Sequence, residues 1–291
     1  MLINSIVDRQ SIEKGWSGDK KYAVVTECGE RYLLRISPLE KLERRRREFD
    51  KMCQVASLGI PMARPIEIGT CDEGVYTIES FIDGYDAEEY IRKLPCEQQY
   101  SFGLDAGRIL AKIHTIPAPG DIQSWEARFN AKIDRKMAMY QNCDLKYDND
   151  RPILNYIKEN RCLLANRPQT YQHGDYHIGN MMIDKNDLLH VIDFDRDDFG
   201  DPWEEFNRIV WCAEAAPEFA KGMVDGYFNG NVPLEFWQLL CLYICSNTLS
   251  SLPWAIPFGE EEIQTMRTQA NEVLNWYDNM TSVIPAWYEK R

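Results

Sequence analysis

The sequence predicts an α+β protein with two lobes, in which a small antiparallel sheet is followed by a mostly helical region. Its 291 residues are about twice the usual length of one domain. Residues before Ser80 carry strand and turn signals, whereas apolar residues beyond Gly84 recur at helical spacing. We therefore expect an N-terminal lobe over 1–82, a hinge near 79–84 and a C-terminal lobe over 83–291.

Composition excludes several classes of protein. The formal net charge of −13 argues against nucleic acid as a partner, because phosphates require a basic surface. The longest apolar run, FWQLLCLYIC, is shorter than the roughly 20 residues of a membrane span, so no membrane association is expected. The N-terminus lacks a secretory signal, and the nine cysteines show no C-x-x-C pair. We expect a cytoplasmic protein with reduced thiols.

Two strand pairs are expected in the first lobe. KYAVVTECGERYLLRIS has two apolar, β-branched segments around a turn at residues 28–30. RPIEIGTCDEGVYTIESF repeats this pattern around residues 72–74. Together these segments predict a small, mostly antiparallel sheet.

One helix is expected between these strand pairs. In SPLEKLERRRREFDKMCQVASLGIP, Ser37 can cap the helix, Pro38 fits its first turn and Glu40 completes a capping box. Gly59 ends it. The run of arginines at 44–47 cannot all lie on one face, which predicts that most of it is solvated helix surface, with anion binding as the alternative.

The second lobe is expected to be largely helical. Amphipathic patterns cover residues 102–113, 125–140, 153–164, 206–215, 234–249 and 261–277. Within this region NMMIDKNDLLHVIDF instead predicts a strand, a turn at residues 185–187 and a second strand.

The polar stretch YQHGDYHIGNMMID precedes this hairpin, and HVIDFD ends it. Mg²⁺ prefers oxygen ligands of the kind that Asn180 and Asp193 supply. Asp175, five residues before Asn180, would then face a substrate hydroxyl. Phosphoryl transfer requires positioning, metal neutralisation and such a carboxylate. A simple polar turn is the alternative, because Gly, Asp and Asn are common in loops.

His173 admits two interpretations. As a zinc ligand it would need further His or Cys residues at zinc spacing, and only His177 lies nearby, in a loop interrupted by glycines. We therefore favour a structural His173 that bonds to backbone near the second acidic segment.

The segments HGDYHIGN and IDFD resemble the motifs of the aminoglycoside phosphotransferase and choline kinase-like family, from about residue 12 to about residue 250. The resemblance implies a bilobal, protein-kinase-like fold and a kinase that uses Mg²⁺ with ATP or GTP. Its implied roles are a catalytic base at Asp175, Mg²⁺ ligands at Asn180 and Asp193, and structural support from His173, Asp201 and Glu205.

The same resemblance makes residues 1–82 a nucleotide-binding lobe. Ser17, between Gly15 and Gly18, would belong to a phosphate-covering loop, and no Walker A sequence occurs. Arg35 occupies the place of the usual phosphate-gripping Lys, and Glu48 is its expected partner.

The resemblance also implies which residues bind the purine of the nucleotide and which bind the acceptor. The backbone at Ser80 and Ile82 would bind the purine. Arg196 matches a position near the active site, and Asp197 and Asp198 are acidic candidates for an amine-rich ligand, with solvated surface acids as the alternative.

The expected function is transfer of the γ-phosphate to a hydroxyl of a cationic, aminoglycoside-like small molecule by a monomer or weak dimer. The alternatives are a metabolic kinase for choline, a sugar amine or another small alcohol, and a catalytically inactive nucleotide-binding module. A single panel of acceptors separates them.

Overall fold

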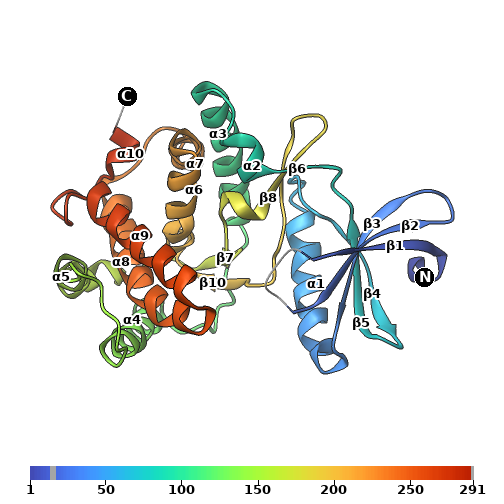
Figure 1. The fold of residues 1–291 in the computed structure, drawn as a ribbon, viewed down its shortest axis with the longest axis horizontal. Helices are drawn as coiled ribbons and strands as arrows, with labels where there is room; N and C mark the ends of the chain where they lie inside the picture. The colour runs from blue at the N-terminus through green and yellow to red at the C-terminus, as the bar shows by residue number, and fades with distance from the viewer. Residues whose placement is uncertain (14–17, 290–291) are drawn as a thin grey trace. The chain divides into compact units, whose positions relative to one another are not determined.

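The computed structural model of the protein describes residues 1–13 and 18–289 (Figure 1). By their internal contacts, the residues form two compact units. Unit 1 contains Met1–Tyr90 and Asn180–Asp197, and unit 2 contains Ile91–Gly179 and Asp198–Arg291. The hairpin after the HGDYHIGN segment is thus grouped with the N-terminal residues, whereas the sequence boundaries placed it in the second lobe.

Unit 2 is mostly helical. Its α-helices are α3 (Cys96–Ile113), α4 (Trp125–Gln141), α5 (Arg151–Asn160), α6 (Ile209–Ala215), α7 (Pro217–Phe228), α8 (Leu234–Ala255), α9 (Glu260–Trp276) and α10 (Ala286–Glu289). The short elements are η3 (Arg161–Leu164), η5 (Glu204–Arg208), η6 (Ile256–Phe258), β7 (Thr170–Gln172) and β10 (Asp198–Gly200). The predicted helical character of this region is confirmed.

Helices α3 and α7 approach each other unusually closely. A side chain at Gly222 would clash with the backbone of Tyr100, and one at Gly107 would clash with the backbone of Met223. Glycine therefore serves here to bring two helix backbones into contact. The glycines also dilute the apolar pattern of α7, so periodicity alone did not predict this helix.

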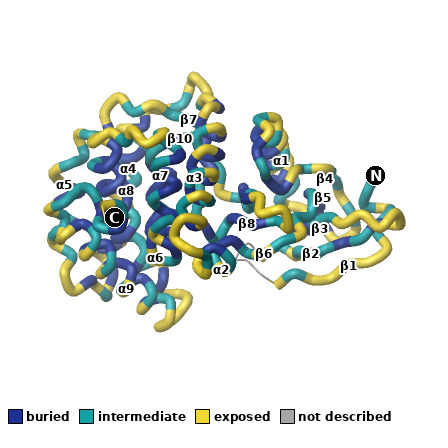
Figure 2. Tube along the Cα trace, turned by 90° about the horizontal axis from the view of Figure 1, so that it is seen from above, coloured by how far each residue is buried: buried dark blue, intermediate teal, exposed yellow. Residues whose placement is uncertain are grey.

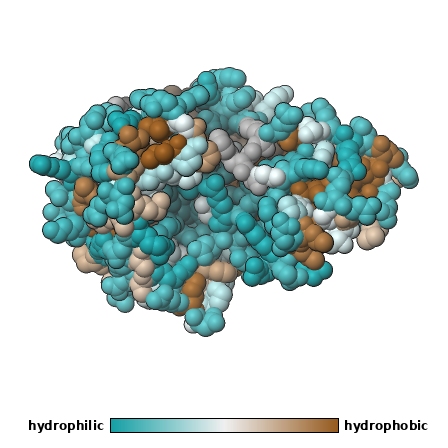
Figure 3. Space-filling view, turned by 60° about the horizontal axis from the view of Figure 1, so that its bottom comes forward, coloured by the Kyte–Doolittle hydropathy of each residue, from teal (hydrophilic) through white to brown (hydrophobic). Residues whose placement is uncertain are grey.

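The core of unit 2 is built around α8. Dark-blue buried segments follow α7 and α8 in Figure 2. The segment Leu234–Phe258 is long and apolar enough to cross a membrane by length and composition alone, with 67% of its most apolar window buried inside the protein. Such burial is typical of a core helix. Figure 3 shows a mostly hydrophilic face interrupted by separate apolar patches.

Unit 1 contains a five-stranded antiparallel sheet in the order β1-β2-β3-β5-β4. Its strands are β1 (Ile6–Ile12), β2 (Lys20–Thr26), β3 (Arg31–Ser37), β4 (Pro65–Cys71) and β5 (Gly74–Ser80). Both predicted hairpins are confirmed. The edge strand β1 was not predicted, and none of its residues is buried, so it lacks an alternating pattern.

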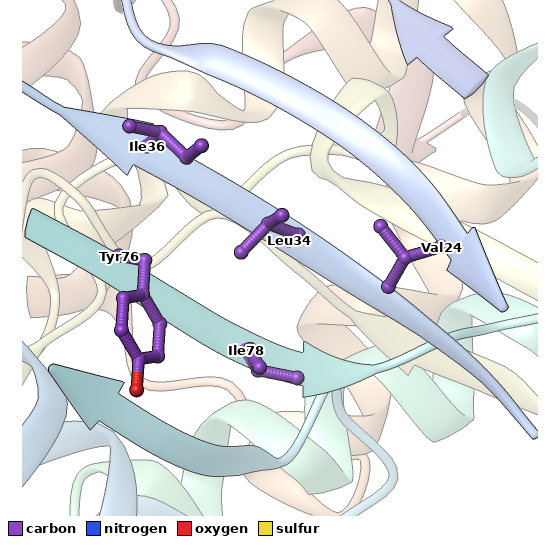
Figure 4. Packing of buried hydrophobic residues seen from close by; sticks show 5 residues of the cluster. All are labelled: Val24, Leu34, Ile36, Tyr76 and Ile78. Atoms are coloured by element: carbon purple, nitrogen blue, oxygen red, sulfur yellow. The ribbon is translucent and has the colours of Figure 1, made fainter. Parts of the chain in front are cut away.

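Alternation along β3 separates its two faces. Leu34 and Ile36 pack with Val24, Tyr76 and Ile78 in one apolar cluster (Figure 4). Because neighbouring side chains on a strand point to opposite faces, Arg35 points away from this cluster. The sequence of β3 therefore sends the charged side chain of Arg35 to the face opposite the apolar packing.

Helix α1 (Leu42–Ala56) follows η2 (Leu39–Lys41), and α1 contacts β4 and β5. The predicted capping box is wrong: Lys41 is the N-cap residue and no side chain caps the helix. Ser37 belongs to β3 and its Oγ accepts from Arg45 Nε at 2.9 Å. A tertiary ion-pair network uses the hydroxyl that local capping would have used.

The remaining elements of unit 1 form a three-stranded sheet in the order β6-β8-β9. These strands are β6 (Gly84–Asp86), β8 (Met181–Asp184) and β9 (Leu189–Val191). Helix α2 (Ala87–Ile91) follows β6, and η4 (Ile178–Asn180) precedes β8. The hairpin of β8 and β9 is confirmed, with Asp187 at φ 57° in its turn.

Candidate active site

His173 anchors the loop that carries Asp175. Its side chain is fully buried, and the ring meets Tyr176 edge-on with centroids 5.7 Å apart. The backbone N–H of Asp175 donates to His173 Nδ1 at 3.3 Å. This hydrogen bond turns the chain immediately after β7, so the His supports the backbone that carries the carboxylate.

Glu205 braces the same loop from η5. Its carboxylate accepts from the backbone N–H of Gly174 at 3.0 and 3.1 Å and from that of Tyr176 at 3.3 Å. Glu205 is buried, so these bonds satisfy a charge that would otherwise be costly. The loop is held on both sides of Asp175.

The carboxylate of Asp175 lies beside two cationic or titratable side chains. Arg208 Nε is 3.1 Å from Asp175 Oδ1, and His177 Nε2 is 3.9 Å from the same oxygen. The Asp175 side chain is 17% exposed, so solvent reaches it. The sequence did not point to Arg208, which lies between Asn207 and Ile209 in the FNRIVW segment and belongs to no recognised motif.

Asp201 supports the start of η5. It is fully buried and accepts from Arg167 Nε at 2.7 Å, from the Tyr243 hydroxyl at 2.6 Å and from the backbone N–H of Trp203 at 3.0 Å. The guanidinium of Arg167 also lies 3.8 Å from the Trp203 ring centroid. These contacts all lie inside unit 2, and they indicate that Asp201 has a structural role.

Asn180 and Asp193 flank the hairpin in unit 1. The backbone N–H of Ile192 donates to the carbonyl of Asn180 at 3.1 Å, so the two residues lie at the same end of the β8–β9 pair. Asp193 adopts φ 66°, a left-handed conformation that is uncommon for a residue other than glycine. A strained backbone of this kind is often retained where a side chain must point in one direction.

The side chain of Asp193 suits a cation. Its Oδ1 is buried without a hydrogen bond within the described part of the chain, and the nearest charge is Arg35 Nη2 at 3.6 Å. Across residues 1–13 and 18–289, no three His, Cys, Asp or Glu side chains gather as a metal site. Mg²⁺ typically takes only one or two carboxylates, together with phosphate oxygens and water. Asn180 and Asp193 fit that requirement.

Arg35 is buried among carboxylates. It forms ion pairs with Asp195, with Asp193 at 3.6 Å and with Asp19 at 3.9 Å. Burial by itself lowers the pKa of Arg35, but Asp195 and the neighbouring carboxylates outweigh it and raise the pKa above its usual value. The guanidinium is therefore charged at every physiological pH.

The expected pair between Arg35 and Glu48 is not formed. Glu48 instead accepts from Arg44 Nε and from Arg45 Nη1, each at 2.6 Å. Arg45 is buried and also reaches Asp195 at 3.1 Å. The prediction that most of the arginine run is solvated is confirmed, since the other three arginines at 44–47 are exposed. Arg45 alone of the four is buried, between Glu48 and Asp195.

The other residues that were predicted to bind the nucleotide differ in how free they are to do so. The backbone N–H of Ser80 donates to Arg64 O at 2.9 Å, so this N–H already has a partner inside unit 1. Ile82 follows the end of β5 and is partly exposed. Ser17 and Gly15 lie outside the described residues.

The acids predicted to bind an amine-rich substrate already have cationic partners. Asp197 pairs with Lys51 in unit 1. Asp198 accepts from Arg128 Nη2 at 3.0 and 3.2 Å in unit 2. Arg196 is exposed. Neither carboxylate offers an unpaired charge to a cationic ligand.

Solved structures share this fold at low sequence identity. A thermostable mutant of aminoglycoside phosphotransferase APH(4)-Ia, in ternary complex with AMP-PNP and hygromycin B, is 16% identical, with 95% of each chain covered and a TM-score of 0.67. The GDP complex of an aminoglycoside 2'-phosphotransferase-IIIa mutant is 15% identical, covering 96% of this chain and 94% of that one, with a TM-score of 0.68. A choline/ethanolamine kinase family protein from Mesorhizobium loti is 14% identical, with coverages of 95% and 91% and a TM-score of 0.66.

These likenesses confirm the predicted protein-kinase-like fold. A search of curated proteins found no match. The profile of the phosphotransferase enzyme family matches residues 8–237, which is well over half of the chain. The chain therefore belongs to the phosphotransferase enzyme family.

Proposed function

We propose that the protein is a kinase that transfers the γ-phosphoryl group of ATP or GTP to a hydroxyl of a small-molecule acceptor. The observation that carries this proposal is the support given to Asp175. One buried His, one buried Glu and one Arg fix the loop and its carboxylate. A carboxylate that is held in this manner suits a group that must meet a hydroxyl in one orientation.

Asp175 is the proposed catalytic base. It orients the acceptor hydroxyl and accepts its proton as the oxygen attacks the γ-phosphorus. Arg208 keeps the carboxylate in place, because its Nε lies 3.1 Å from Asp175 Oδ1. His173 and Glu205 act through the backbone and do not meet the substrate.

Asn180 and Asp193 are the proposed Mg²⁺ ligands. The unbonded Oδ1 of Asp193 and its left-handed backbone support this assignment. A bound Mg²⁺ would neutralise phosphate charge. Arg35 is the proposed phosphate-gripping cation, and its planar guanidinium suits two phosphate oxygens at once. Ser17, Glu48 and the backbone at Ser80 and Ile82 complete the proposed nucleotide site.

The chemical class of the acceptor is the most specific part of the proposal. Solved neighbours of the same fold bind hygromycin B or carry the name of a choline/ethanolamine kinase family. Aminoglycosides and amino alcohols are therefore the first cationic acceptors to test. The expected acids for such ligands, Asp197 and Asp198, are paired with Lys51 and Arg128. This pairing weakens the expectation of a cationic acceptor without changing the reaction.

We propose a cytoplasmic monomer or weak dimer.

The test is a phosphorylation assay with purified protein, Mg²⁺ and either ATP or GTP. The acceptor panel holds cationic, neutral and anionic alcohols, and products are identified by mass spectrometry and ³¹P NMR. We expect a phosphorylated product from at least one acceptor and no product after chelation of Mg²⁺. Thermal stabilisation by Mg-nucleotide without product from any acceptor would instead favour the inactive nucleotide-binding module. No stabilisation and no product would remove both interpretations.

A further inference from the structure

The side chain of Arg45 joins four parts of unit 1. Its Nε donates to Ser37 Oγ, at the end of β3, at 2.9 Å, and its Nη1 donates to Glu48 Oε2 on α1 at 2.6 Å. Nη1 also donates to Asp195 Oδ1 at 3.1 Å, and Nη2 pairs with Asp19. The side chain is 5% exposed, so these acceptors compensate a charge that would otherwise be costly to bury. All three nitrogens of the guanidinium therefore have partners.

The carboxylate of Asp195 connects Arg45 to Arg35. Its Oδ1 accepts from Arg45, and its Oδ2 accepts from Arg35 Nη1. The backbone carbonyl of Asp195 also accepts from Arg44 Nη2 at 3.1 Å. A carboxylate that is bound at both oxygens cannot turn without breaking an ion pair, and charge-assisted hydrogen bonds of this kind are strong. The place of Arg45 therefore determines where Asp195 holds Arg35.

Arg35 keeps one edge of its guanidinium without a hydrogen bond. Nη1 is the nitrogen that Asp195 holds, and Nη2 lies 3.6 Å from Asp193 Oδ1, which is longer than a hydrogen bond. Nε is buried and forms no hydrogen bond with the residues that the structure describes. Because Nε and Nη2 donate along the same edge of the planar group, that edge can hold two oxygens of one phosphate. Asp195 thus leaves the phosphate-binding edge of Arg35 available.

Asp19 connects the same arginine to the start of β2. Its carboxylate is fully buried and accepts from Lys41 Nζ at 3.1 Å in addition to Arg45. It follows Gly18, which adopts φ 68°, a conformation that favours glycine. Ser17, which the sequence predicts to cover the phosphates, lies two positions before Asp19 in the chain. Arg45 therefore also holds the residue that follows the predicted phosphate-covering segment.

We propose that Arg45 is a positioning residue for nucleotide binding: through Asp195 it holds Arg35 with its Nε–Nη2 edge free to bind two phosphate oxygens. The inference rests on the proposed kinase function, in which Arg35 grips the phosphates. Glu48 then contributes one step further away, by holding Arg45. Lysine cannot replace Arg45, because one ammonium nitrogen cannot reach all the acceptors that three guanidinium nitrogens serve. A purely structural Arg45 would only tie α1 to the sheet and would not affect the nucleotide.

Binding of Mg-AMP-PNP and Mg-GMP-PNP, measured by isothermal titration calorimetry, tests the proposal without turnover. We expect Arg45→Lys to raise the Kd of whichever nucleotide wild type binds more tightly by at least about tenfold, because a misplaced Arg35 loses a charged hydrogen bond to phosphate. Arg46→Lys is the matched control on the same helix, because its side chain is 57% exposed and pairs with Glu43. The control should bind the nucleotide as wild type does.

Steady-state kinetics distinguish positioning of the nucleotide from catalysis. With the acceptor that wild type phosphorylates fastest, Arg45→Lys should raise the KM of the nucleotide by a factor similar to the rise in Kd. The value of kcat and the KM of the acceptor should change less, because the lost contact is made in the bound nucleotide as well as in the transition state.

A double-mutant cycle shows whether Arg45 acts through Arg35. Arg35→Gln alone should weaken nucleotide binding. Adding Arg45→Lys to it should raise the Kd by less than about twofold more, because the effects of coupled residues are not additive. Effects that multiply in the double variant would show that Arg45 does not act through Arg35.

Loss of stability is separated from loss of binding by a second buried arginine. Arg167 is 9% exposed and binds Asp201 through two nitrogens, but it lies in unit 2. Arg167→Lys and Arg45→Lys should both lower the urea midpoint, and only Arg45→Lys should raise the nucleotide Kd at a temperature where both are folded. Ser37→Ala is a smaller change that removes the acceptor of Arg45 Nε, and it should raise the Kd by roughly threefold. This variant decides the question where Arg45→Lys does not fold.

The two proposals fail in different ways. Wild-type nucleotide affinity in folded Arg45→Lys, or in Ser37→Ala where the first variant does not fold, would overturn the positioning role and leave the kinase intact. Equal rises in Kd for Arg45→Lys and Arg167→Lys would do the same, because affinity would then follow stability alone. Failure of folded wild-type protein to bind either nucleotide would overturn the kinase and the inference together.

Discussion

Arg208 lies against Asp175, with Nε 3.1 Å from Oδ1, and both residues belong to the same compact unit. The pair brings a cation from η5 to the carboxylate of a loop that follows β7. It restricts the rotation of Asp175 while leaving 17% of the side chain exposed. This combination suits a base that must stay oriented and still meet a substrate.

Arg208→Gln tests this restriction. Loss of the guanidinium leaves the Asp175 carboxylate free to rotate, and small displacements of catalytic groups reduce rates by up to about 100-fold. We expect kcat to fall roughly tenfold or more, with a smaller change in the nucleotide KM. Arg208→Lys keeps the charge and should recover part of the loss. Equal kcat values for wild type and Arg208→Gln would show that Arg208 does not position the base.

Asp201→Ala should destabilise unit 2. The substitution leaves Arg167, which is 9% exposed, without its buried counter-charge and removes the acceptor of the Tyr243 hydroxyl. Breaking a buried pair in this way costs about 3–5 kcal/mol of unfolding free energy, measurable by urea denaturation. The matched control is Glu43→Ala, whose side chain is 80% exposed and pairs with Arg46. That change should cost less than about 1 kcal/mol. Similar losses in the two variants would contradict the structural role of Asp201.

Glu79 should make the stability of unit 1 depend on pH. Burial raises the pKa of this carboxyl to about 7; Arg35 opposes the rise, and Asp195 and Asp193 add to it. The folded state therefore holds a proton that the unfolded chain releases near pH 4.5. Stability from this group is complete below pH 4.5 and is lost as the pH rises through about 7.

Glu79→Gln removes that loss. At pH 8 the variant should unfold with a free energy higher than wild type by on the order of 3 kcal/mol, and the difference should shrink to less than about 1 kcal/mol near pH 5. Urea denaturation at pH 5, 6.5 and 8, without nucleotide or divalent cations, measures both values. A difference that stays constant with pH would show that Glu79 has an ordinary pKa in the folded protein.

Local signals in the sequence were sufficient for most of the fold. The two hairpins of unit 1 have β-branched segments around glycine turns, and most helices of unit 2 have apolar residues at regular spacing. Helix α7 and strand β1 escaped prediction for opposite reasons. Glycines dilute the apolar face of α7, and β1 has no buried face at all.

Tertiary partners were much less predictable. The HGDYHIGN motif identifies Asp175 because the other residues of the motif are its neighbours in the chain. Arg208 acts through a contact that only the fold creates, so its local sequence contains no trace of it. The partners of Glu48 are by contrast local, because Arg44 and Arg45 precede it on the same helix by four and three residues.

Phosphoryl transfer by Asp175→Asn tests the central claim most directly. The amide keeps the size of the side chain but cannot accept the hydroxyl proton, and general-base catalysis typically contributes 10²–10⁴-fold. With Mg-nucleotide and the acceptor that wild type phosphorylates fastest, we predict that kcat falls by at least about 100-fold while urea denaturation shows a folded protein. A folded variant that keeps the wild-type rate would contradict the assignment of Asp175 as the base.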